Sequence, residues 1–195
     1  LEDLHHQSED PGTSFVGRPF LLPRTEPGEP WEWFTSRSAN LDRRIADAEQ
    51  WSDPPRQLLV FDPRRDGLIV EVFGRLQSAQ HVAVVVPGIG NELAGYEEGL
   101  RASVATLHDS LDYPAVATIG WLGYDAPDNL LDAALSDPTD AAVSLSRFFA
   151  GLEHTVDRDV HSTVIGHSYG SVVTGAAARA GVRVDEVVLV GSPGV

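Results

Sequence analysis

The stretch that decides the fold is STVIGHSYGSVVTGAAARAG, residues 162–181. Its first five residues are typical of a buried strand, residues 169–180 favour a helix of small side chains, and Gly181 is expected to end that helix. Between them, Ser168 occupies a sharp strand-to-helix turn, which lifts a side chain off the carboxyl edge of a sheet. The turn predicts that Ser168 is a nucleophile, and a structural serine in a glycine-rich turn is the alternative.

Small neighbours and a helix N-terminus support the nucleophile hypothesis. A strained turn crowds the flanking chain, and Gly166 and Gly170 reduce that crowding on either side of His167, Ser168 and Tyr169. The small residues of the following helix let it lie close to the sheet, with its N-terminus directed at Ser168. The positive end of the helix favours a developing oxyanion.

Strand and helix patterns alternate over the remainder of residues 51–195. Two strand-like runs, 56–63 and 67–74, flank Asp66-Gly67, which is a strong hairpin signal. Further runs predict strands at 81–90, with its core at 82–86, and at 115–123 and 185–195. Helical spacing predicts helices at 93–107 and 138–156, with Thr139 or Asp140 capping the second helix. Residues 82–86 are apolar on both faces, as in parallel sheets covered by helices. We predict an α/β domain with a mostly parallel sheet and an antiparallel N-terminal hairpin.

Residues 1–50 differ in composition from the remainder of the chain. Five prolines lie between Pro11 and Pro30 and prevent regular structure there, and one helix is predicted from Ser38 to Trp51. We therefore divide the chain into a Pro-rich arm with one helix, 1–50, and a core, 51–195. The arm is interpreted as an extension or a linker.

Composition limits the partners that the protein can have. The net charge of −15 disfavours nucleic acid as a partner, and no segment reaches membrane-spanning length. The absence of cysteine excludes disulfides and thiolate metal sites. No signal-peptide pattern opens the chain, which favours the cytoplasm, but there is no methionine either, so we expect that the native N-terminus is missing.

Residues 56–195 resemble the first part of an α/β-hydrolase. They are most similar to an uncharacterised actinobacterial branch with a GHSYG nucleophile turn, and the matching pieces are 84–90, 119–126, 165–171 and 188–194. The resemblance implies a sheet that lacks its C-terminal strands, so that the chain is expected to be truncated at the C-terminus. It also implies an oxyanion hole made by the backbone N–H of Tyr169 and a second N–H from the loop at 87–92.

The resemblance puts that second donor at Ile89, with Gly88 and Gly90 as alternatives. A plain connecting loop and a nucleotide-binding loop are the competing interpretations. A dinucleotide fingerprint needs Gly or Ala where Leu93 stands, which disfavours a nucleotide. Asp125 follows the strand at 115–123 at the same edge and, with Trp121 and Tyr124, is a candidate for the pocket wall, and a turn residue is the alternative for Asp125. No histidine–carboxylate cluster suggests a metal, and no cofactor is predicted.

The acid and the base that would activate Ser168 cannot be found in the sequence. In this fold they follow the nucleophile, but the 27 residues after Ser168 contain no histidine. We expect them beyond Val195. Our hypothesis is a serine hydrolase acting on a small-molecule ester or acyl substrate, and a non-catalytic binding or interaction module is the alternative. The oligomeric state is not predicted.

Overall fold

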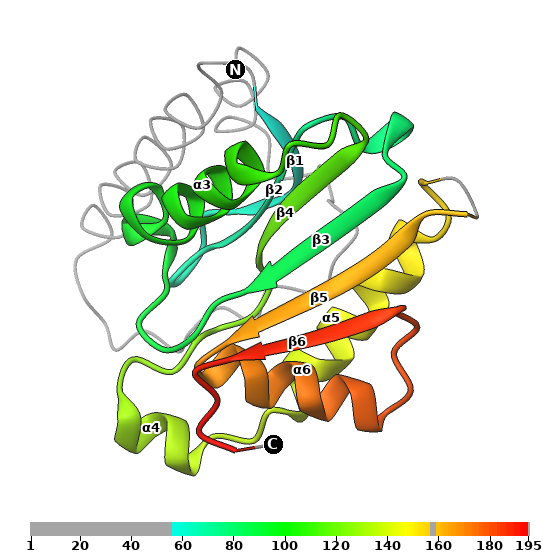
Figure 1. The fold of residues 1–195 in the computed structure, drawn as a ribbon. Helices are drawn as coiled ribbons and strands as arrows, with labels where there is room; N and C mark the ends of the chain where they lie inside the picture. Colours follow the sequence, from blue (N-terminus) through cyan, green and yellow to red (C-terminus); the bar gives the residue numbers. More distant parts are fainter. Residues whose placement is uncertain (1–55, 157–158, 195) are drawn as a thin grey trace, which may run out of the picture. The chain divides into compact units, whose positions relative to one another are not determined.

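The computed structural model describes residues 56–156 and 159–194, and the predicted helix at 38–51 lies outside them. Residues Arg56–Val195 form a unit of their own, and it is the unit described below. It contains a six-stranded sheet with the strand order β1-β2-β4-β3-β5-β6. The predicted α/β class, with a mostly parallel sheet and an antiparallel N-terminal hairpin, is confirmed (Figure 1).

The N-terminal hairpin consists of β1 (Gln57–Asp62) and β2 (Leu68–Phe73), which pair antiparallel. Its turn has positive φ at Arg65 (56°) and at Gly67 (81°), and glycine adopts such values without steric cost. β2 also pairs antiparallel with β4 (Val116–Leu122), so the hairpin forms one edge of the sheet.

The parallel part of the sheet comprises β4, β3 (His81–Val86), β5 (His161–His167) and β6 (Glu186–Val190). Helix α3 (Ala102–Ser110) lies on one face, and α5 (Thr139–Leu152) and α6 (Tyr169–Arg179) lie on the other (Figure 1). Residues from the strands and from α5 and α6 make up most of the core cluster. It includes Val70, Val84, Ile119, Trp121, Leu145, Phe149, Val164 and Val173. Parallel strands covered on both faces explain the continuous apolar runs in the sequence.

The segment after β3 is less regular than its helical spacing predicts. It contains a 3₁₀ turn η2 (Leu93–Gly95), a π-helical turn η3 (Glu97–Arg101) and only then the α-helix α3. Another 3₁₀ turn, η1 (Leu76–Ser78), connects β2 to β3. Leu93, Tyr96, Leu100 and Val104, which recur at helical spacing, are all buried, but the spacing could not show that the backbone changes its winding.

Two further local features differ from the predictions. The short helix α4 (Leu130–Leu135), capped by the Asn129 side chain, was not predicted. The predicted cap of α5 by Thr139 or Asp140 is wrong, because the carboxylate of Asp137 accepts bonds from the N–H and the hydroxyl of Thr139 instead. These bonds stabilise the ionised carboxylate and lower the pKa of Asp137. Among the described residues, no helix is long and apolar enough to cross a membrane.

Candidate active site

Ser168 lies directly between β5 and α6 with a strained backbone. Its φ of 53° and ψ of −124° lie outside the regions that L-residues normally adopt. Its N–H donates to the Val190 carbonyl at the end of β6 (2.9 Å), and its own carbonyl accepts from the Ser171 N–H (2.9 Å). Strain of this kind persists only where the surroundings impose it, and it is concentrated at functional sites.

The two glycines beside the turn have no room for a side chain. A Cβ on Gly166 would lie 2.7 Å from the backbone of Gly170 and Ser171, and one on Gly170 would lie 2.3 Å from the carbonyl oxygens of Val86 and Pro87. The close approach of β5, α6 and the end of β3 therefore requires glycine at both positions. This is the packing reason for the Gly-His-Ser-Tyr-Gly pattern.

The loop after β3 lies against the nucleophile candidate. A Cβ on the buried Gly88 would lie 2.7 Å from the Cβ and 3.1 Å from the Oγ of Ser168. The carbonyl of Gly88 accepts from the side-chain amide of Asn91 (3.2 Å). Because the C=O and N–H of a trans peptide point in opposite directions, this bond directs the N–H of Ile89 away from Asn91.

Hydrogen bonds to the segment between β4 and α4 also hold the loop after β3 in place. The buried Tyr124 hydroxyl donates to the Pro87 carbonyl (2.7 Å), and the Gly90 N–H donates to the Pro127 carbonyl (2.8 Å). Burial raises the pKa of Tyr124, so its hydroxyl stays a proton donor. Gly90 has φ +67°, which suits glycine at the bend of the loop.

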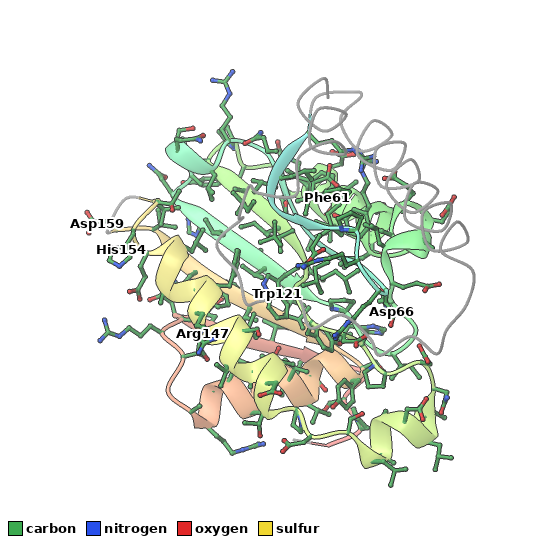
Figure 2. The ribbon with its side chains drawn as sticks, turned by 180° about the vertical axis from the view of Figure 1, so that it is seen from behind. Phe61, Asp66, Trp121, Arg147, His154 and Asp159 are labelled. Atoms are coloured by element: carbon green, nitrogen blue, oxygen red, sulfur yellow. The ribbon has the colours of Figure 1, made fainter. Side chains whose placement is uncertain are left out.

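The aromatic residues of the predicted pocket stack on one another, and Tyr124 bonds to the loop through Pro87. The rings of Trp121 and Tyr124 stack with centroids 5.8 Å apart, and Tyr124 stacks in turn on Tyr169 at 6.5 Å. Trp121 is only 2% exposed and belongs to the core, where it also contacts Phe148 of α5. Figure 2 shows Trp121 in the interior of the unit. Contact of these rings with a substrate remains a prediction.

The third residue of the predicted pocket, Asp125, is exposed and forms a hydrogen bond with Asp66 of the β1–β2 turn. That bond raises the pKa of Asp125, because a shared proton is favoured over two adjacent negative charges. The same turn contacts the loop after β3, where the Leu93 N–H donates to the Asp66 carbonyl (2.7 Å). The β1–β2 turn therefore helps to hold the loop after β3 in place.

Two serines that the sequence analysis did not single out contact the turn. The buried Ser171 hydroxyl donates to the Ser168 carbonyl (2.5 Å) and is hydrogen-bonded to the Ser192 hydroxyl (2.8 Å). Ser192 lies just after β6 and accepts from the Gly194 N–H (3.1 Å). A serine three residues after the candidate nucleophile was visible in the sequence, but its partner lies 21 positions further on.

The histidines within residues 56–156 and 159–194 are not placed to serve Ser168. His81 and His161 are paired at the first positions of β3 and β5, at the opposite edge of the sheet. His108 is bonded to Thr118 within β4 (2.6 Å), and His154 follows α5. Figure 2 shows His154 at the opposite end of the unit from Asp66. His167 precedes Ser168 and lies beside Gly191.

Two cavities in the described part of the chain lie away from Ser168. These cavities, of about 310 and 690 Å³, lie at the amino edge of the parallel strands and include His81 and Asp185 respectively in their linings. Both are at the wrong edge of the sheet for Ser168. The described residues include no group of three histidine, aspartate or glutamate side chains that could hold a metal.

Comparisons with known proteins agree with the architecture. A family model described as alpha/beta hydrolase matches residues 62–195. An uncharacterized protein of Mycobacterium tuberculosis is 38% identical over 178 residues, which cover 83% of this chain and 66% of the relative. A second protein of that organism is 31% identical, and the match covers 81% of this chain and 27% of the relative. The chain therefore spans less than two thirds of the length of the curated relatives it matches.

A solved structure with a similar fold is an α/β serine hydrolase from Xanthomonas campestris. It has a TM-score of 0.49 and 13% identity, and the match covers 71% of this chain and 62% of that chain. The family resemblance drawn from the four sequence pieces is confirmed by the family model, and the matched relatives are mycobacterial, as the actinobacterial resemblance implied.

Proposed function

The chain belongs to the alpha/beta hydrolase family, and from this premise we propose that the complete protein is a serine hydrolase that cleaves an ester-type acyl bond. The observation that carries the proposal is the strained backbone of Ser168 at a strand-to-helix turn, with Gly88 packed against its side chain. A nucleophile turn requires this conformation, whereas a structural serine has no need of it.

The proposed reaction begins when the Ser168 hydroxyl attacks the ester carbonyl carbon and gives its proton to a general base. The tetrahedral intermediate then expels the alcohol, which takes that proton, and leaves an acyl group on Ser168. Water, deprotonated by the same base, attacks the acyl-enzyme and releases the acid. We assign the base and its orienting acid to residues outside the described part of the chain.

We assign the binding of the oxyanion to the backbone N–H groups of Tyr169 and Ile89, which would donate hydrogen bonds to it. Two observations support this assignment. Tyr169 is the first residue of α6, so its N–H belongs to the positive end of that helix. The Gly88–Ile89 peptide lies beside Ser168 and has its carbonyl bonded to Asn91. Loss of one oxyanion donor typically lowers kcat by about 10²–10³-fold.

Active-site labelling tests the role of Ser168. The full-length protein is treated with a fluorophosphonate probe, which reacts with activated serines, and labelling of Ser168→Ala is compared with that of the wild type. Ser110→Ala serves as a control because Ser110 is an exposed residue at the end of α3. We expect the wild type and Ser110→Ala to be labelled and Ser168→Ala not to be.

Two results would contradict the proposal. Equal labelling of Ser168→Ala and the wild type would show that Ser168 is not the nucleophile. No labelling of a correctly folded full-length wild type would favour the alternative, in which this hydrolase fold is a non-catalytic binding or interaction module. Esters of graded acyl length would then define the substrate of a labelled protein.

A further inference from the structure

A chain of hydroxyl hydrogen bonds links the segment after β6 to the carbonyl of Ser168. A hydroxyl has only one proton, and that of Ser171 is used on the Ser168 carbonyl (2.5 Å). The 2.8 Å bond between the two hydroxyls therefore requires Ser192 to be the donor and Ser171 the acceptor. The Gly194 N–H in turn donates to Ser192 (3.1 Å). We call the pair Ser171 and Ser192 the serine relay.

The carbonyl that this relay holds belongs to the Ser168–Tyr169 peptide. The N–H of the same peptide unit is the N–H of Tyr169, and it points away from the carbonyl because the peptide is planar and trans. Any rotation of this unit about its flanking bonds moves the two groups together. A bond that fixes the Ser168 carbonyl therefore also fixes the direction of the Tyr169 N–H.

We propose that Ser171 and Ser192 are positioning residues that orient the Tyr169 N–H toward the oxyanion of the substrate. This inference rests on the proposed function, since it assigns a task to residues around the same nucleophile. Ser171 is fully buried and lies on α6, whereas Ser192 is exposed and follows β6. The relay thus connects the nucleophile turn to a separate strand through polar groups rather than apolar packing.

The local backbone explains why such a relay is needed. Ser168 has an unfavourable conformation (φ 53°, ψ −124°), so the peptide that follows it has an intrinsic tendency to relax. The Ser171 N–H already donates to the Ser168 carbonyl (2.9 Å), as in any helix start. The relay adds a second donor to the same oxygen and ties that donor, Ser171, to the segment after β6. Preorganised donors of this kind need no reorientation as charge develops.

The test substitutes Ser192, the exposed residue of the serine relay. Ser192→Ala deletes the donor to Ser171 without changing a buried side chain, and Ser192→Thr keeps a hydroxyl at this exposed position. We expect Ser192→Ala to slow fluorophosphonate labelling and ester turnover, with kcat about 10-fold lower and KM within about twofold of the wild type, because only transition-state stabilisation is lost. Ser192→Thr should recover most of the rate.

A second readout does not depend on catalysis. In ¹⁵N-labelled full-length protein, the amide resonance of Tyr169 should shift in Ser192→Ala and return toward its wild-type position in Ser192→Thr. Ser110→Ala should change neither the rate nor this resonance. Such results would support the relay even where the melting temperature is unchanged, which separates positioning from a merely structural role.

The proposal is overturned if Ser192→Ala reacts as fast as the wild type, or if its Tyr169 amide does not move. A loss confined to thermal stability, with kcat unchanged, would also overturn it. Failure of the proposed function has a different signature. In that case the wild type itself is not labelled and the relay has no oxyanion to serve, whatever the Tyr169 amide does.

Discussion

Substitution of Gly88 by alanine tests the contact between the loop after β3 and Ser168, the proposed nucleophile. The added Cβ would lie 2.7 Å from the Ser168 Cβ, 3.1 Å from its Oγ and 3.2 Å from the His167 carbonyl. Carbon atoms in contact prefer about 3.5–4.0 Å, so the shortfall is about 1 Å. The loop and the serine must separate by roughly this distance, because the backbone on both sides is hydrogen-bonded.

A displacement of about 1 Å at a reacting centre can cost about 10²-fold in rate, and overpacking a buried site typically costs about 1–3 kcal/mol of stability. We therefore expect the second-order rate of fluorophosphonate labelling of Gly88→Ala to fall about 100-fold, with the protein still folded. The assay is a labelling time course on full-length protein, with the melting temperature measured in parallel.

Gly95→Ala is the matched control. Gly95 lies seven residues further along the same segment, in η2, and a Cβ there would meet nothing within 4 Å. Its labelling rate should equal that of the wild type. If Gly88→Ala also reacts at the wild-type rate and melts at the wild-type temperature, the loop does not lie against Ser168, and the assignment of the oxyanion donor to Ile89 loses its support.

Two predictions concern residues outside the turn. Glu71 is 3% exposed and contacts Arg101 (3.3 Å), Arg56 (3.7 Å) and the Tyr96 hydroxyl (3.1 Å). Glu71→Ala should therefore lower the free energy of unfolding, measured in urea, by about 3–5 kcal/mol, because it leaves buried charges without their partner. Substitution of the exposed Glu98 by alanine should change this free energy little, and equal losses in the two variants would refute a buried ion network. Asp125 has a raised pKa through its bond to Asp66, so its stabilising contribution is present at low pH and is lost as pH rises through that pKa, above the ordinary value of 3.8. Asp125→Asn should therefore have a melting temperature that depends less on pH between about pH 4 and 7 than the wild type, and parallel pH curves would contradict this coupling.

The strands, the order of elements and the strand-to-helix turn at Ser168 could be predicted because each has a local signal. Continuous apolar runs indicated the buried strands, and Asp66-Gly67 indicated the hairpin turn. Gly181, which has φ +86°, follows the end of α6 as expected. The short helix α4 was missed because its leucines are exposed, at 69–79%, and share no buried face. Periodicity detects a helix only through the face that it buries.

The contacts that complete the site could not be predicted for a different reason. The Ser171–Ser192 bond joins residues 21 positions apart, and the bond from Tyr124 to the Pro87 carbonyl joins residues 37 apart. Such pairings depend on which strands become neighbours, and here β5 pairs with β6 on one side and β3 on the other. Single residues carry no signal of their distant partners, so only the loop and the turn were foreseeable.

The strain at Ser168 makes the site depend on several elements at once. β6 holds its N–H through Val190, α6 holds its carbonyl through Ser171, and the loop after β3 closes on its side chain through Gly88. A conformation that costs about 1–3 kcal/mol survives only when its surroundings over-determine it, and these three supports come from three different parts of the chain. Weakening any one of them should therefore affect the reactivity of Ser168 before it affects the fold, because most of the core lies on β2–β5 and α5 and only Tyr169 of this turn belongs to it.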